Sequence, residues 1–164
     1  DSLSAGGEVD LLVRKLNHLV AEGLDFDQVV DAITTYQSKT KLLFVLAKVD
    51  NLVKNGRLSK LIGTVVGLLN IRMVGEASKT GTLELLQKAR GQKKAIKAAF
   101  DELIKAGYTG GHITIAHRNN DKFIEQFSEL VREKFAQASI EVLPTSGLCS
   151  FYAEEGGLLM GYEI

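Results

Sequence analysis

Two amphipathic helices are predicted at the start of the chain. In the segment EVDLLVRKLNHLVAEG, apolar residues recur at intervals of three and four, and Gly23 closes the helix. Asp25 is a typical N-cap for a second helix, which we expect to end near Thr40. Its apolar stripe comprises Phe26, Val29, Val30 and Ile33. Residues 1–40 are therefore expected to form a linking segment and a helical hairpin.

Strands and helices alternate over residues 41–164. The continuously apolar run at 41–47 predicts a buried strand, followed by a short helical turn in NLVKNG. Further strands are expected in NIRMVGE, TLELLQKAR, GGHITIAHR, SIEVLPT and at 158–163, and TLELLQKAR has a helical alternative. Helices are expected in QKKAIKAAFDELIKAG and NDKFIEQFSELVREKFAQ, with a turn or short helix at 153–156. The alternation predicts an α/β fold, a layered mixed sheet with flanking helices in a single compact domain.

Length and composition restrict the class of protein. The chain has 164 residues, 45% of them hydrophobic and 24% charged, which excludes a collagen-like repeat, a disordered tail and a disulfide scaffold. The single cysteine, Cys149, cannot form an internal disulfide, so we expect a cytoplasmic protein. No secretory leader and no apolar stretch of about 20 residues is present, so membrane insertion is not expected. Because the chain starts at Asp1, we expect a fragment of a longer protein.

A net charge of zero conceals three blocks of opposite sign. Residues 1–53 carry a net charge of −3, residues 54–97 carry +8, and residues 98–164 carry −5. The basic block predicts a positive local field that can hold a phosphate, a carboxylate or an acidic protein surface. Its lysines Lys93, Lys94 and Lys97 fit a solvated helix face, whereas Arg57, Arg72 and Arg90 fall at turns and strand ends.

The common catalytic and metal-binding patterns are missing from the sequence. His18, His112 and His117 do not have the spacing of a zinc site, and no phosphate-binding glycine loop or nucleophile elbow occurs, so no metal or cofactor is expected. Cys149 is interpreted as a small buried apolar residue. His117, before Arg118, has two interpretations: a residue that orients an anion or moves a proton, or a capping histidine. The basic block has no aromatic residue, which disfavours nucleic-acid binding.

Two smooth apolar segments, LIGTVVGLLNIRMV and GGLLMG, accompany this basic block. Gly63 and Gly67 in the first segment clear one face for another element or for a ligand chain. An apolar slot with a cationic or hydroxyl-bearing end suits an amphiphile with a buried tail and a hydrogen-bonded carboxylate. The same residues are equally compatible with an ordinary core.

The order of the segments resembles the DegV family of bacterial fatty-acid-binding proteins. The resemblance rests on DSLSAGG, the helical hairpin, GRLSK at 56–60, LLNIR at 68–72, Arg90 with the following QKKAI, HITIAHR and the closing GGLLMGYE. It implies a DegV C-terminal-lobe fold, with residues 1–40 as the linking segment, residues 41–164 as the lipid-binding lobe and the N-terminal lobe absent.

The resemblance also implies a function without catalysis. A long-chain fatty acid would lie in an apolar tunnel, and members linked to a fatty acid kinase present the bound acid for phosphorylation. Arg57, Ser59 and Arg90 would lie near the head group or the kinase-docking face. The tunnel would be lined by Leu68, Leu69, Ile71, Met73, Leu158 and Leu159.

One segment departs from the family pattern. Many members carry His-Thr-Gly before the closing strand, whereas residues 151–155 here are FYAEE. We expect Ser150 or Tyr152 to supply a hydroxyl group instead. Two other functions stay open at this point: a phosphotransferase-type enzyme subunit that uses block 54–97 with His117, and a structural or regulatory module that binds neither ligand.

Overall fold

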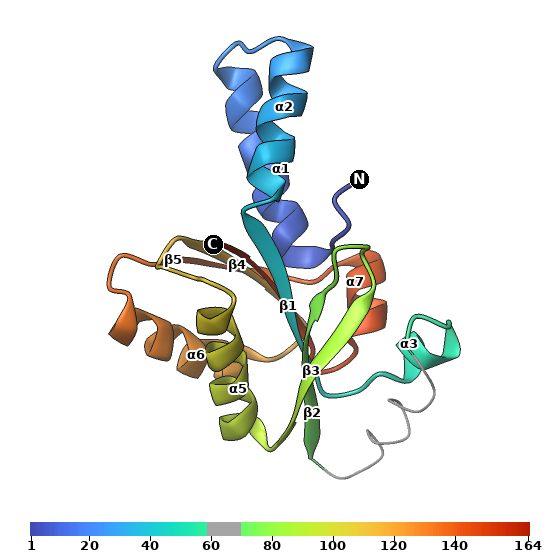
Figure 1. Ribbon diagram of the computed structural model, residues 1–164. Helices are drawn as coiled ribbons and strands as arrows, with labels where there is room; N and C mark the ends of the chain where they lie inside the picture. The colour runs from blue at the N-terminus through green and yellow to red at the C-terminus, as the bar shows by residue number, and fades with distance from the viewer. Residues whose placement is uncertain (59–69) are drawn as a thin grey trace.

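A six-stranded mixed sheet forms the centre of the molecule. The computed structural model describes residues 1–58 and 70–164 (Figure 1). The strands lie in the order β3-β2-β1-β6-β4-β5, and only β4 and β5 pair in parallel. Their bounds are β1 (Thr40–Leu46), β2 (Ile71–Ala77), β3 (Leu83–Arg90), β4 (His112–His117), β5 (Ser139–Pro144) and β6 (Leu158–Glu163). The predicted layered α/β fold with a mixed sheet is confirmed.

Helices cover both faces of this sheet unequally. One face packs against α5 (Gln92–Lys105) and α6 (Asp121–Lys134), and the other lies under the short helices α3 (Asp50–Lys54) and α7 (Gly147–Ala153) (Figure 1). The hairpin of α1 (Gly6–Ala21) and α2 (Phe26–Gln37) projects away from the body. Within the two described ranges, no helix is long and apolar enough to cross a membrane.

The continuously apolar run of β1 supplies both faces of the sheet. Leu43 and Val45 belong to the core under α5 and α6, whereas Leu42, Phe44 and Leu46 belong to a second core on the opposite face. Successive side chains of a strand point to opposite sides, so a strand covered on both faces carries no polar positions. The prediction of a buried strand at 41–47 is thereby confirmed.

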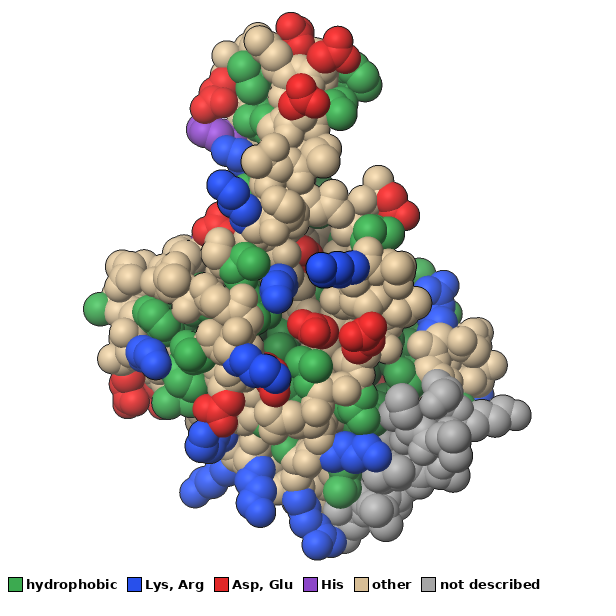
Figure 2. All heavy atoms as spheres, in the orientation of Figure 1, with side chains coloured by type: hydrophobic (Ala, Val, Ile, Leu, Met, Phe, Trp, Pro, Cys, Tyr) green, Lys and Arg blue, Asp and Glu red, His purple; other side chains and the backbone are tan. Residues whose placement is uncertain are grey.

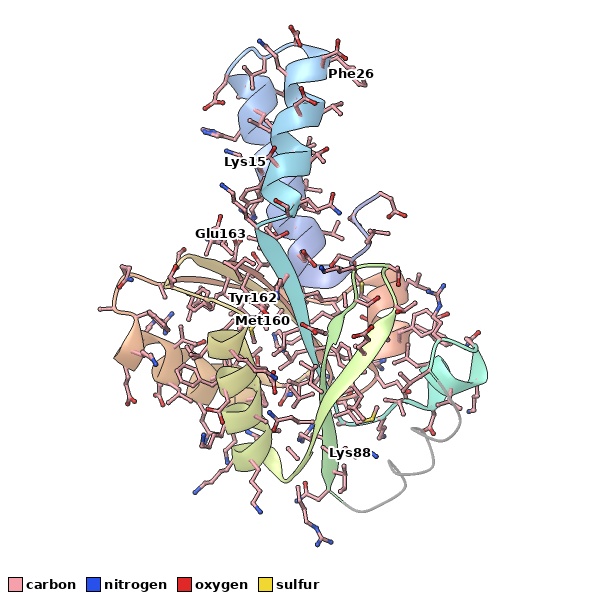
Figure 3. All side chains as sticks on the ribbon, viewed as in Figure 1. Lys15, Phe26, Lys88, Met160, Tyr162 and Glu163 are labelled. Carbon is pink, nitrogen blue, oxygen red and sulfur yellow. The ribbon has the colours of Figure 1, made fainter. Side chains whose placement is uncertain are left out.

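The hairpin agrees with the prediction in its cap and differs in its packing. The Asp25 side chain accepts a hydrogen bond from the Gln28 backbone N–H at 2.9 Å, and the Gln28 side chain caps the Asp25 N–H in return. No residue of α2 is buried, and Phe26 at the tip is 80% exposed (Figure 3). The apolar stripe of α2 therefore contacts no core, because the helix extends beyond the sheet.

Only the first turns of α1 pack against the sheet. Gly7 and Gly161 permit this contact, since a Cβ atom on Gly161 would stand 2.2 Å from the backbone nitrogen of Glu8. The Glu8 carboxylate is buried and accepts hydrogen bonds from the hydroxyls of Ser4 and Thr40. This contact fixes the N-terminal segment beside the face that carries α3 and α7.

The remaining predicted elements are found, with two boundaries shifted. Helix α2 ends at Gln37 and not near Thr40, which is the first residue of β1. The short helix expected at 153–156 lies earlier, as α7, because Glu154 has a positive φ of 54° that ends the helix. The apolar segment that contains Gly63 and Gly67 lies outside the described residues.

Candidate functional site: an apolar cavity beneath the sheet

A cavity of about 410 Å³ lies on the sheet face that carries α3 and α7. Side chains from β1, β2, β3 and β6 line one side of it, and α3, α7 and the N-terminal segment line the other. The lining comprises Leu3, Ser4, Ala5, Leu42, Phe44, Leu46, Leu52, Gly56, Arg57, Ala77, Gly81, Thr82, Leu83, Leu148, Cys149, Tyr152, Ala153 and Leu159. The cavity is thus predominantly apolar, and it has few polar side chains.

Strand alternation explains which side chains reach this cavity. On β1 the lining residues are Leu42, Phe44 and Leu46, each two positions from the next. Leu159 of β6 pairs with Phe44 and points to the same side. Among the described residues, the helices opposite these strands are α3, with five residues, and α7, with seven. The cavity lies between these short helices and the strands.

Among the described residues, the cationic side chain at the cavity is Arg57, and it contacts the aromatic ring of Tyr152. Arg57 Nε donates a hydrogen bond to the Tyr152 hydroxyl at 3.0 Å, and the guanidinium carbon lies 4.9 Å from the centre of the Tyr152 ring. The backbone N–H of Arg57 donates to the carbonyl of Leu52 at 2.9 Å, which fixes the turn after α3. The Arg57 side chain is exposed, so its charge is available to an anion at the edge of the cavity.

Glu154 and Glu155, at the end of the FYAEE segment, do not line the cavity. Glu154 accepts a hydrogen bond from the backbone N–H of Asn51 at 2.9 Å. Glu155 faces Arg118, with 3.7 Å between the carboxylate and Nε, and accepts from Asn119 at 3.2 Å. Their negative charges are therefore directed into local contacts and away from the cavity.

The structure brings three of the predicted site residues to the cavity: Arg57, Tyr152 and Leu159. Met73 is buried in the same core but does not line the cavity, and half-buried Ile71 does not line it either. Three further predicted residues do not line the cavity: Leu158, Ser150 and the exposed Arg90. The predicted Ser59, Leu68 and Leu69 lie outside the described residues.

Local contacts explain where these last side chains point. Leu158 is fully buried in the core under α5 and α6, on the opposite face from its neighbour Leu159. The Ser150 hydroxyl lies 2.8 Å from the hydroxyl of Thr145, so it is engaged at the base of α7. Neighbouring residues of one strand cannot both face the cavity, because successive side chains point to opposite faces.

Several lining residues were not identified from the sequence. Leu42, Phe44 and Leu46 were recognised as buried, but a run without polar positions does not reveal which face each residue serves. Cys149 was expected to be a small apolar residue, and it is partly buried in the cavity wall. Leu3, Ser4 and Ala5 gave no signal, because only the contact of α1 with the sheet places them there.

Half of the basic side chains of block 54–97 gather near the end of β3 and the start of α5. Side chains of Lys88, Arg90, Lys93, Lys94 and Lys97 are all exposed, and positive charge gathers along the lower edge of Figure 2, where Figure 3 labels Lys88. None of these five side chains lines the cavity. The predicted positive field therefore lies in part at the C-terminal end of β3 and the start of α5.

Arg72 differs from the other basic residues because its guanidinium is buried. Its Nε and Nη1 atoms have no hydrogen-bond partner among the described residues. Burial lowers the pKa of Arg72. Arg72 precedes Met73 on β2, so its side chain points to the opposite face of the sheet and does not line the cavity.

His117 adopts the capping role that the sequence left open. Its Nδ1 accepts a hydrogen bond from the backbone N–H of Asn120 at 3.2 Å, and its Nε2 lies 3.9 Å from the Asp121 carboxylate. This contact stabilises the start of α6. Over residues 1–58 and 70–164, no three His, Cys, Asp or Glu side chains form a group that could hold a metal ion.

The fold is an α/β domain with one filled sheet face and an apolar cavity on the other face. A family model described as "Uncharacterised protein, DegV family" matches residues 1–162, and the chain belongs to this family. A DegV domain-containing protein of Streptococcus pneumoniae is 78% identical over 164 residues, which are all of this chain and 58% of that protein. The chain therefore spans less than two thirds of the length of this curated relative.

Solved structures give the same result. A crystal structure of the Streptococcus pneumoniae fatty acid kinase B3 protein loaded with linoleic acid is 78% identical, with a TM-score of 0.97 over 100% of this chain and 58% of that one. A DegV family protein from Eubacterium eligens loaded with heptadecanoic acid is 34% identical, with a TM-score of 0.95 over 99% of this chain and 59% of that one. The DegV fold expected from the sequence is confirmed.

Proposed function

We propose that this chain binds the tail of a long-chain fatty acid non-covalently in the apolar cavity and has no catalytic activity of its own. The observation that carries the proposal is the cavity itself, which is apolar except for a few side chains that include the paired Arg57 and Tyr152. Two related proteins of solved structure hold a fatty acid, which supports the same assignment.

The size and chemistry of the cavity suit an acyl tail. Its volume of about 410 Å³ falls in the range of roughly 300–1,000 Å³ that is typical of ligand pockets. Burial of about 15 methylene groups at about 0.8 kcal/mol each contributes a gross driving force near 12 kcal/mol, before ordering costs. Such a tail needs no charged partner along its length, in agreement with the leucine-rich wall.

The carboxylate end of the ligand fits the cationic edge of the cavity. Arg57 supplies a guanidinium that can pair with a carboxylate, and Tyr152 holds that guanidinium by both its hydroxyl and its ring. In this arrangement residues 41–164 form the lipid-binding lobe, and the linking segment 1–40 contributes Leu3, Ser4 and Ala5. A ligand held with its carboxylate at this edge can be presented to a fatty acid kinase subunit in the cytoplasm.

The contacts of His117 argue against a phosphotransferase centre in this chain. Its Nδ1 already accepts the Asn120 N–H, and the exposed lysines and Arg90 of the basic block lie away from the cavity. A carrier carries lipid through purification and shows no turnover, whereas a phosphotransferase requires Mg²⁺ and a nucleotide. These two expectations separate the alternatives in one preparation.

The test is extraction of fatty acids from the purified full-length protein that contains this chain, followed by mass spectrometry and a molar protein assay. We expect near-stoichiometric fatty acid in the unmodified protein. Cys149→Trp, which fills the cavity from α7, should lose it. Phe151→Trp is the matched control, because Phe151 lies on the same helix, is 45% exposed and does not line the cavity.

Two results would contradict the proposal. One is an unmodified protein that neither carries nor takes up fatty acid. The other is a folded Cys149→Trp variant with the same fatty acid content as the unmodified protein and the Phe151→Trp control.

A further inference from the structure

One position on the sheet side of the cavity lacks a side chain. Met73, Gly75 and Ala77 occupy alternate positions of β2 on this face, and Gly75 is buried between them. In the sheet, Gly75 pairs with Phe44 of β1 on one side and with Leu85 of β3 on the other. A gap in the apolar wall therefore lies directly beside the ring of Phe44.

The ring of Phe44 occupies this gap. A Cβ atom on residue 75 would stand 2.3 Å from Cζ and 2.8 Å from Cε2 of Phe44, distances that no real side chain adopts. Phe44 also lines the cavity, and only 1% of its surface is exposed. The absence of a side chain at residue 75 thus lets the ring lie over β2, where it occupies less of the cavity.

We propose that the Phe44–Gly75 pair is a specificity determinant that sets which acyl tails the cavity accepts. This inference rests on the proposed function. The aromatic ring covers β2 at Gly75, between Ala77, which lines the cavity, and Met73, which does not. Gly75 lets the ring retreat far enough to leave room for a tail. Because the ring and the tail compete for the same volume, the side chain at residue 44 controls the length and bend of the tail that fits.

Phe44→Leu is the variant that isolates this effect. A leucine is too short to fill the space over Gly75, so the cavity extends toward β2 and longer or bent tails gain burial. Each additional methylene that becomes buried raises affinity about fourfold. Gly75→Ala is less informative, because the new methyl group would also stand 2.2 Å from the carbonyl oxygen of Glu84 and would displace the backbone.

The experiment offers the full-length protein an equimolar mixture of hexadecanoic, octadecanoic and linoleic acids and measures the bound fraction of each by extraction and mass spectrometry. We expect Phe44→Leu to raise the ratio of octadecanoic to hexadecanoic acid by about tenfold or more, as two further methylenes become buried. Phe44→Met, whose longer unbranched side chain reaches further over Gly75 than leucine does, should shift the ratio in the same direction by less. This variant replaces Phe44→Leu if Phe44→Leu does not fold.

The matched control is Phe127→Leu, which makes the same change in the core on the other face of the sheet. Its ratio should equal that of the unmodified protein. Two results would overturn this inference and leave the proposed function standing. One is an unchanged ratio of octadecanoic to hexadecanoic acid in folded residue-44 variants that still carry fatty acid. The other is an equal shift of this ratio in Phe127→Leu. An unmodified protein that takes up none of the three acids would instead overturn the proposed function.

Discussion

The two faces of the sheet differ in packing, although the same strands form both. The face under α5 and α6 is filled, with Phe123, Phe127, Ile113 and Ile115 all fully buried. The face under α3 and α7 contains the cavity of about 410 Å³. The filled face is covered by two helices of 14 residues each. On the cavity face, the described residues place the first turns of α1 over β6 and β4, and the short helices α3 and α7 beside the cavity.

Aromatic packing reinforces the filled face. The rings of Phe123 and Phe127 stack with 6.1 Å between their centres, and Tyr108 contacts Tyr162 edge to face at 6.3 Å. Such pairs contribute about 0.5–1.5 kcal/mol beyond the burial of their area. On the cavity face the pair of Phe151 and Tyr152 lies on α7, at the margin of the cover. The difference predicts that equivalent substitutions have unequal effects on the two faces.

Phe127→Ala should show the largest effect on stability. Removal of a fully buried ring from a filled core leaves a new cavity, and we expect a loss of about 3–5 kcal/mol in the free energy of unfolding. The measurement is urea denaturation monitored by circular dichroism. Cys149→Ala on the cavity face should cost less than about 1 kcal/mol, because its thiol already borders empty space. Equal losses for the two variants would contradict the distinction between the faces.

A fatty acid should stabilise the folded protein through contacts on the cavity face only. Hexadecanoic acid at about 100 times its Kd is expected to raise the free energy of unfolding by about 2.7 kcal/mol, because it binds the folded state only. Cys149→Trp should abolish this increment, and Phe127→Leu should retain it although its stability is lower. Thermal denaturation with and without ligand measures both. Retention of the full increment in Cys149→Trp would place the ligand somewhere other than the cavity.

Alkaline pH should lower the stability of the protein by ionising a buried tyrosine on the filled face. Burial, with a smaller contribution from the charge of Glu163, raises the pKa of Tyr108 to about 12 from its usual value near 10. Because the folded-state pKa is the higher one, the stabilisation is complete below pH 10 and is lost as the pH rises toward 12. The expected loss is on the order of 2 kcal/mol. Tyr108→Phe should flatten this decline in urea denaturation series, and an unchanged slope would contradict it.

The filled face could be predicted from the sequence further than the hollow one. The helices that cover it repeat apolar residues at three and four, and Ile96, Ala99 and Leu103 of α5 are buried as that period requires. The cavity left no comparable pattern, since Leu42 and Leu43 are equally apolar but serve opposite faces. Family resemblance supplied Arg57 and Leu159, whereas Leu158 was assigned to the tunnel because adjacent leucines look alike in a sequence.

The hairpin shows the converse limit of sequence patterns. The period of α2 predicts a buried stripe, and the helix forms with its cap, but Phe26 and Val30 are exposed. Periodicity indicates that a helix has an apolar face; it does not indicate what covers that face.

The smallest effect is expected at the polar edge of the cavity, where Tyr152→Phe removes one hydrogen bond. The ring stays beside Arg57, but the guanidinium loses the hydroxyl partner at 3.0 Å that orients it. A hydrogen bond of about 0.5–1 kcal/mol corresponds to a twofold to fivefold weaker Kd for hexadecanoic acid.

Arg57→Ala removes the charge itself and should weaken binding further. The melting temperature of either variant should stay near that of the unmodified protein, because Arg57 is exposed. Fluorescence competition with a labelled fatty acid measures the Kd. If Tyr152→Phe weakened binding as much as Arg57→Ala, the hydroxyl itself would contact the carboxylate; if Arg57→Ala left the Kd unchanged, the head group would lie elsewhere.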